Sequence, residues 1–454
     1  MNLRPFGPWA TALLALVLVA CAADVARPTA TPSSAESAGA TASPGAPESQ
    51  TVPAPGSDSA VYPPNPASIV VAIDAGHGGC LDWGVADPSE RGEDLSEKAM
   101  TLGIALRLRD LLTAEGIGVV MIRDADEALA GDQYPPLGCD GPAWRDVNGD
   151  GLAGFGPDLP EATRTRDELQ ARLDLANLAR ADALVSIHIN SPFDAGEPVE
   201  IAFTETFYTD ETPWGASATA ELAGSVQAGV VARLGAMADY ERGDRGTTAH
   251  NFYMVAPPLF DVTPERDDPV KQPTRGGLMP VVLAEVGSIT LRSEQDLLGS
   301  ADGQVAVATG LLDGLAAYFT ERRLAARIDL ADDDYLERPA SLTGDGPPFW
   351  APVMPDGPLE LRLTNTGTAA WPGDMELVAG WGVSEDPYLA RSPGELLPLE
   401  ANVPALAPGE SVVMAVELPT APAGRALAWI SLSGDGATTA DRGSPALQLS
   451  SQAP

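Results

Sequence analysis

The sequence predicts an α/β domain with a mostly parallel sheet covered by helices on both faces, followed by a C-terminal all-β domain. Continuous apolar runs such as residues 69–73 are typical of strands that are covered on both faces. Segments with helical spacing alternate with these runs, which favours parallel strands joined by crossover helices. After residue 345, short alternating strands and frequent turn signals indicate a small β-sandwich.

Each element of the α/β domain follows from its own pattern. The predicted strands are residues 69–73, 119–122, 183–187 and 281–284. The predicted helices are residues 97–115, 168–180, 217–236 and 302–320. In the first helix Leu108 and Leu112 lie at helical spacing, and Gly116 is its predicted C-terminal stop. Two Gly-, Pro- and charge-rich insertions, residues 125–166 and 256–279, interrupt the pattern, and loops of this length are usually functional or disordered.

The composition limits what the chain can do. Its 454 residues have room for two or three domains, and a hydrophobic fraction of 44% is enough to build cores. There are 64 acidic residues against 27 basic ones, which gives a formal net charge of −37. Because such a surface repels nucleic acid, we expect no nucleic-acid partner. The sequence leaves the oligomeric state open.

The N-terminal residues predict export. Residues 1–20 combine Arg4 with an apolar stretch that is too short to span a bilayer, as in a signal peptide. The following Leu18-Val19-Ala20-Cys21 resembles the lipobox of bacterial lipoproteins, in which the cysteine carries the lipid. An ordinary signal peptide with an incidental cysteine is the alternative. Residues 21–66 are rich in Ala, Pro, Ser and Thr and predict a disordered tether, so the lipid would be the only membrane contact.

Two cysteines remain after Cys21. An exported chain meets an oxidising compartment, so Cys80 and Cys139 could form a disulfide. Two free thiols are the alternative, because pairing depends on a geometry that the sequence does not give.

Two of the three histidines end predicted strands. His77 follows the run at 69–73, and His188 closes the run at 183–187. Ligands of open α/β sheets bind beyond the carboxyl ends of the strands, where two imidazoles can share one metal ion. A hydrogen-bonded structural histidine is the alternative for each. For the third, His250, a solvated loop position is the favoured interpretation, with a substrate contact as the alternative.

Two carboxylates are candidates to complete such a site. Glu97 opens the helix after His77 and could be the third zinc ligand. The segment from Asp94 to Glu97 also fits a capping box, with Asp94 as the N-cap and Glu97 reaching back to it. Glu285 ends the run at 281–284 and could be a general base, or a solvated acid at a strand end.

A further motif lies in the first insertion. Asp146, Asn148 and Asp150 resemble the start of a calcium-binding loop, with Asp158 or Glu161 available as the downstream acid. A polar turn built from the same residue types is the alternative. The sequence thus offers Ca²⁺ as a second candidate ion beside Zn²⁺.

Residues 68–320 resemble the zinc-dependent N-acetylmuramoyl-L-alanine amidases. Five motifs occur in the order of that family: residues 73–79, 97–98, 123–126, 172–190 and 283–287. The chain departs from the family in its two long insertions and in Gly287-Ser288, where the family has Gly-Phe. These departures concern substrate fit and gating, since they remove none of the proposed ligands.

The resemblance implies a specific chemistry. It implies that His77, Glu97 and His188 bind zinc and that Glu285 is catalytic. The substrate would be peptidoglycan, cut between the lactyl group of MurNAc and L-Ala. One alternative is a binding or scaffold lipoprotein with an inactive amidase domain. Another is a zinc peptidase of related fold, although we find no motif that would bind a free terminal carboxylate.

The C-terminal domain carries a second likeness. Residues 365–372 resemble the immunoglobulin-like domains with recurrent tryptophans, and Trp371 and Trp429 are expected in its core. The predicted layout is therefore an amidase domain at 67–325, a linker at 326–344 and an immunoglobulin-like sandwich at 345–454.

Overall fold

The structure is a computed structural model, which describes residues 65–79, 82–129, 147, 166–194, 197–212, 214–256, 276–331, 354, 357–383, 394–423 and 426–451. Several predictions concern residues outside these ranges and stay predictions. They are the signal peptide, the tether before residue 65, the lipid on Cys21, the Cys80–Cys139 pair and the calcium loop of Asp146, Asn148 and Asp150. Among the described residues, no helix is both long and apolar enough to span a bilayer.

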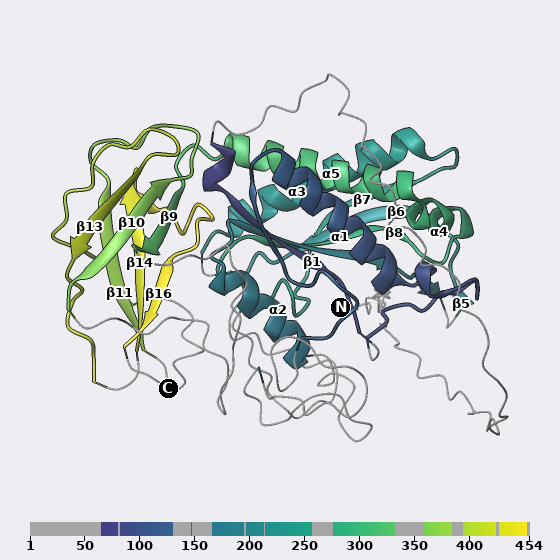
Figure 1. The fold of residues 1–454 in the computed structure, drawn as a ribbon, viewed down its shortest axis with the longest axis horizontal. Coiled ribbons are helices and arrows are strands. Elements are labelled where there is room, and N and C mark those ends of the chain that lie inside the picture. The colour runs from purple at the N-terminus through teal and green to yellow at the C-terminus, as the bar shows by residue number, and fades with distance from the viewer. Residues whose placement is uncertain are drawn as a thin grey trace, which may run out of the picture. The chain divides into compact units, whose positions relative to one another are not determined.

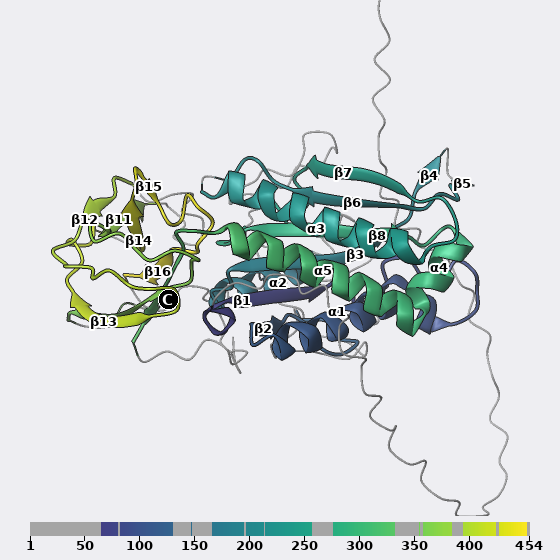
Figure 2. The same ribbon diagram turned by 90° about the horizontal axis from the view of Figure 1, so that it is seen from above.

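The α/β domain is built on a six-stranded sheet with the order β2-β1-β3-β8-β6-β7, which Figure 2 shows face-on. The bounds are β1 Val70–Ala75, β2 Gly118–Met121, β3 Ala183–Asn190, β6 Phe203–Tyr208, β7 Gly243–Ala249 and β8 Val281–Ser288. The four predicted runs form β1, β2, β3 and β8, which pair in parallel. Strand β6 is antiparallel to β8 and parallel to β7, so the sheet is mixed.

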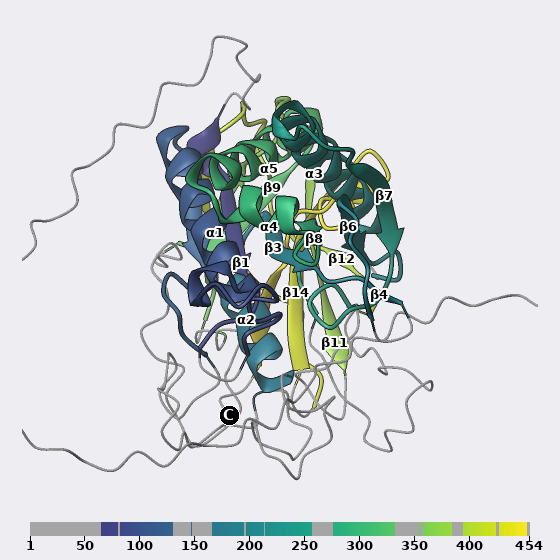
Figure 3. The same ribbon diagram turned by 90° about the vertical axis from the view of Figure 1, so that its right-hand side faces the viewer.

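Helices cover both faces of this sheet (Figures 1 and 3). One face carries α1 (Glu97–Ala114), α3 (Ala216–Met237), α4 (Arg292–Gly299) and α5 (Ala301–Glu321), whose apolar side chains share a core with β1, β3 and β8. The other face carries α2 (Arg166–Leu178), packed against the same strands in a second core. Gly116 adopts a φ of 79° directly after α1, as its predicted role requires.

The register of the parallel strands brings their carboxyl ends together. Ala75 of β1 pairs with Ile187 of β3, and His188 of β3 pairs with Glu285 of β8. After β3 the chain forms a short hairpin, β4 (Phe193–Asp194) with β5 (Glu197–Pro198). The short 3-10 helix at Glu93–Leu95 leads into α1. These segments lie around the carboxyl ends of the parallel strands, where both strand-end histidines lie.

The C-terminal region consists of antiparallel sheets, β13-β10-β9 and β12-β11-β14-β15, with β16 pairing β14. The bounds are β9 Ala326–Leu330, β10 Leu359–Asn365, β11 Glu376–Val383, β12 Leu397–Pro398, β13 Ser411–Val416, β14 Ala426–Gly434, β15 Ala437–Thr438 and β16 Leu447–Ser450. Both sheets contribute to one apolar core that includes Trp371. Residues 326–330, placed in a linker by the sequence, form β9 because their backbone pairs with β10. The immunoglobulin-like likeness stays a prediction.

Candidate metal centre

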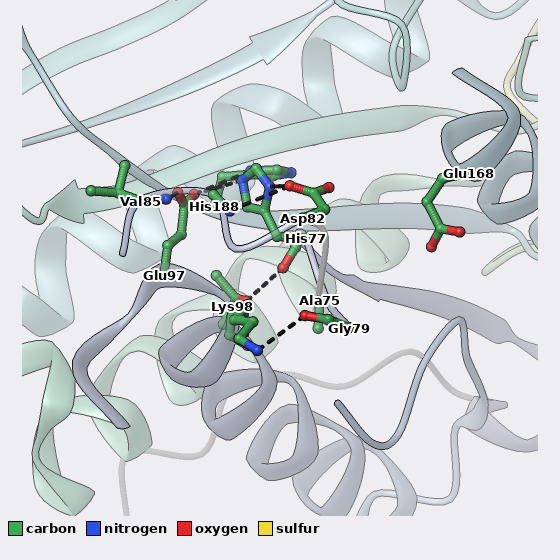
Figure 4. A network of polar contacts seen from close by, with 12 residues as sticks. Ala75, His77, Gly79, Asp82, Val85, Glu97, Lys98, Glu168 and His188 are labelled. Carbon is green, nitrogen blue, oxygen red and sulfur yellow. Dashed lines mark hydrogen bonds and ion pairs between the residues drawn. The ribbon is translucent and has the colours of Figure 1, made fainter. Parts of the chain in front are cut away.

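Three side chains from different elements converge at the carboxyl edge of the sheet. His77 follows β1, His188 lies near the end of β3, and Glu97 opens α1. His77 Nε2 and His188 Nδ1 lie 3.1 Å apart, and Glu97 Oε1 lies 3.2 Å from the first and 3.3 Å from the second. Figure 4 shows the two rings and the carboxylate pointing toward one another. The structure therefore brings together the three residues that the sequence analysis proposed as ligands.

These three atoms fit a zinc ion in number, type and spacing. Imidazole nitrogen and carboxylate oxygen are ordinary zinc ligands, and three protein ligands leave the fourth position of a catalytic site open. In a tetrahedral site with bonds of about 2.0–2.1 Å, the ligand atoms lie about 3.3 Å from one another. The three atoms form the one such His, Cys, Asp and Glu cluster found among the described residues.

The backbone around the cluster is shaped for close approach. His77 itself has a φ of 62°, a conformation that a non-glycine residue adopts at an energetic cost and that is frequent at functional sites. A Cβ on Gly76 would lie 2.5 Å from Cε1 of His188. A Cβ on Gly84, which has a φ of 62°, would collide with Glu97 and His77. Both glycines are therefore needed for the ligands to meet.

Hydrogen bonds from the backbone fix the carboxylate of Glu97. Its Oε2 accepts from Val85 N at 3.0 Å, and its Oε1 accepts from Ile189 N at 3.0 Å. The N-cap of α1 is Ser96, whereas Asp94 lies in the preceding 3-10 helix. The capping-box alternative is thus wrong, because the Glu97 side chain is held toward the cluster and not back toward Asp94.

Asp82 is a functional candidate that the sequence analysis missed. Its Oδ1 lies 2.7 Å from His77 Nδ1, the ring nitrogen that faces away from the cluster. A carboxylate in this position orients a metal-binding imidazole and raises its basicity. Burial lowers the pKa of His77, but Asp82 and Glu97 outweigh it and hold that pKa well above its usual range. In a chain with 64 acids, no sequence pattern distinguished Asp82 from its neighbours.

A buried arginine supports the His77 loop from below. Arg172 of α2 bonds Asp74 Oδ1 at 2.7 Å, the carbonyl oxygen of His77 at 2.7 Å and Glu168 Oε1 at 2.9 Å. Asp74 also accepts from the hydroxyl of Ser186 at 2.6 Å. These contacts tie β1, β3 and α2 together directly beneath the cluster. Arg172 lies within one of the family-like motifs, but no pattern in the sequence predicts this supporting role.

Glu285 lies beside the cluster, one strand away from His188. The two residues are register partners, so their side chains leave the same face of the sheet. The Oε2 atom of Glu285 is buried and has no hydrogen-bond partner among the described residues. Burial and the negative charge of Glu97 raise the pKa of Glu285 well above its usual range. A carboxylate with a raised pKa is a better proton acceptor than an ordinary one, and such groups are frequent at catalytic sites.

His250 is not part of this arrangement. It is exposed at the end of β7, and its ring packs against Phe252 and Phe207 with centroid distances of 4.3 and 6.2 Å. Its backbone N–H donates to the carbonyl of Tyr208 at 2.9 Å. These contacts agree with the interpretation of His250 as a surface residue.

The fold and the cluster together define an α/β protein with a candidate metal centre at the carboxyl edge of its sheet. Residues 71–317, more than half of the chain, match the family model described as N-acetylmuramoyl-L-alanine amidase. The chain therefore belongs to the N-acetylmuramoyl-L-alanine amidase family, whose members hydrolyse an amide bond of peptidoglycan.

The chain is also similar to individual proteins along this region. The germination-specific N-acetylmuramoyl-L-alanine amidase of Bacillus subtilis is 25% identical over 253 residues, which cover 56% of this chain and 81% of that protein. Protein YqiI of the same organism is 26% identical over 251 residues, 55% of this chain and 85% of that one. Among solved structures, the catalytic domain of the amidase CwlV from Bacillus (Paenibacillus) polymyxa is 25% identical, with a TM-score of 0.36, and the match covers 55% and 97% of the two chains.

Proposed function

We propose that this amidase is zinc-dependent, with His77, Glu97 and His188 as the protein ligands and Glu285 as the catalytic acid–base. The observation that carries the proposal is the convergence of three ligand atoms within 3.1 to 3.3 Å of one another, with Glu285 on the adjacent strand. The reaction would be hydrolysis of the amide between the lactyl group of MurNAc and L-Ala.

The residues divide the chemistry between them. When bound, zinc would supply Lewis acidity and would lower the pKa of a water to about 7. Glu285 would accept the proton of the attacking water through its carboxylate, because it lies on the strand next to His188. It would then deliver the same proton to the amine of L-Ala as the amide bond breaks. The raised pKa of Glu285 favours the first of these steps, since it makes the carboxylate a better proton acceptor.

Product analysis tests the proposal against its alternatives. Purified sacculi would be digested with the full-length protein, and the products identified by mass spectrometry with labelling of new amino termini. Free L-Ala amino termini on released peptides are the expected result. Shortened peptides that remain attached to the glycan would indicate a zinc peptidase, and no products from a zinc-loaded protein would indicate an inactive scaffold.

We also propose that the chain acts at the cell envelope as a lipoprotein anchored through Cys21. The lipobox-like residues 18–21 and the apolar stretch before them support this. Metabolic labelling with a fatty acid tests it, because Cys21→Ser should abolish the label.

Two further proposals concern calcium binding at Asp146, Asn148 and Asp150 and a disulfide between Cys80 and Cys139. They are tested by calorimetric titration with Ca²⁺ and by thiol counting before and after reduction.

A further inference from the structure

Buried charges connect the α/β domain to the C-terminal β domain, by which we mean the sheets formed by β9 to β16. Arg327 of β9 donates to the carbonyl of Ala179 at 2.9 Å and lies 3.6 Å from Asp182. Arg180 donates to Asp329 of β9 at 3.1 Å. These four charged side chains are all buried: Arg180, Asp182, Arg327 and Asp329. Buried charges require fixed partners, so these contacts specify one arrangement of the two domains.

An apolar contact lies beside these ion pairs. Trp214, just before α3, packs against Trp429 of β14 with ring centroids 4.9 Å apart. Leu278, Leu427 and Ala446 complete this small core, which draws on both domains. Trp429 is buried, as expected, but it belongs to this small core and not to the main core of the β domain.

A loop of the β domain approaches the α/β domain too closely for a side chain. A Cβ added to Gly443 would lie 2.6 Å from Cβ of Ala218 and 2.9 Å from Pro280. The next residue, Ser444, accepts a hydrogen bond from Arg322, which directly follows α5, at 2.7 Å. Backbone approach at this distance is typical of a packed interior and not of two domains joined by a flexible linker.

These contacts lie at the amino-terminal ends of the strands that deliver the candidate ligands. Asp182 directly precedes β3 and accepts a hydrogen bond from the backbone N–H of Val70, the first residue of β1, at 2.9 Å. Pro280 directly precedes β8. His77, His188 and Glu285 lie at the opposite, carboxyl ends of these same three strands.

We propose that the C-terminal β domain is a fixed structural part of the catalytic unit, which holds together the amino-terminal ends of β1, β3 and β8. It is not a separately moving wall-binding module. Opening of the interface and opening of the strands that carry the ligands are then one cooperative event. By linkage, an ion that binds at the carboxyl ends of the strands stabilises the β domain as well.

Hydrogen exchange of the full-length protein tests this proposal without relying on the proposed function. With a chelator present, Trp429→Ala should accelerate exchange of the slowest amides in β1 and β3 at least tenfold, although Trp429 belongs to β14. Val413→Ala, on an exposed position of β13, is the matched control and should leave those amides unchanged. Acceleration confined to the β domain would overturn the proposal.

A second experiment uses the unaltered protein, so it tests the proposal even if Trp429→Ala does not fold. Zinc at about 100 times its dissociation constant should slow exchange of the slowest amides about 100-fold, in β10 and β14 as much as in β1 and β3. Slowing in β1 and β3 alone would show that the domains unfold independently and would overturn the proposal. If zinc slows exchange in neither domain, the zinc proposal is contradicted. The comparison of Trp429→Ala with Val413→Ala in the presence of chelator then still decides whether the two domains unfold together.

Discussion

Glu285 and His188 are direct register partners on the parallel strands β8 and β3. This places the proposed acid–base next to a proposed ligand without making it part of the ligand set. Glu285→Gln should therefore keep the metal and lose hydrolysis by about 10²- to 10⁴-fold, the usual contribution of a general acid–base. Metal content and initial rates on purified sacculi, measured on the same preparation, check this. Activity near that of the unaltered protein would reject the role of Glu285.

The contact between Asp82 and His77 predicts a separate effect on metal affinity. Asp82→Asn retains the shape of the side chain but removes the negative charge that supports the imidazole. We expect zinc affinity to fall about 10- to 100-fold, as for other carboxylates that support a metal-binding histidine. Competition with a chromogenic chelator measures it. Asp110→Asn, at an exposed position of α1, is the control and should leave the affinity unchanged.

Gly76 predicts a steric effect on the same site. A Cβ at this position would lie 2.5 Å from the His188 ring, so Gly76→Ala should displace that ring and weaken zinc binding. Gly224 lies within α3 and has nothing within 4 Å of an added Cβ. Gly224→Ala should therefore leave metal binding unchanged and stabilise the protein by about 0.5–1 kcal/mol. Equal zinc affinity in the two variants would contradict the proposed geometry.

The ion pair of Asp74 and Arg172 predicts part of the acid sensitivity. Burial raises the pKa of Asp74, but Arg172 and Ser186 outweigh it and leave that pKa below its usual value. The stability that this carboxylate contributes is therefore present above about pH 4 and is lost as the pH falls further.

Asp74→Asn should lower the free energy of unfolding at pH 7 by about 3–5 kcal/mol, because Arg172 loses a buried partner. It should also make the remaining stability less dependent on pH below 4. Urea unfolding between pH 3 and 7 measures both. An unchanged pH dependence would show that Asp74 is not the group that titrates.

The sequence predicted those parts of the fold whose local pattern matches their final environment. Strands β1, β2, β3 and β8 are apolar runs because both of their faces are covered. Strand β7, by contrast, is mostly exposed and reads Gly-Asp-Arg-Gly-Thr-Thr-Ala, so pairing with β6 and not its own pattern makes it a strand. The same holds for β9, which its pairing with β10 defines.

The site residues also divide into those that a local sequence pattern predicts and those that only the folded structure identifies. His77 and His188 were predictable because His77 lies just after one apolar run and His188 closes another. The choice between cap and ligand for Glu97 required the hydrogen bonds from Val85 and Ile189, which come from distant parts of the chain. Asp82 could not be singled out, since its function depends on which nitrogen of His77 faces it.

The central claim is that His77, Glu97 and His188 bind one zinc ion that amide hydrolysis requires. Its most direct test is the zinc content of the purified full-length protein and of His188→Ala, measured together with muropeptide release. We expect about one zinc per chain in the unaltered protein, and loss of both zinc and L-Ala-terminated products in His188→Ala. Undiminished product release by a zinc-free His188→Ala protein would contradict the account.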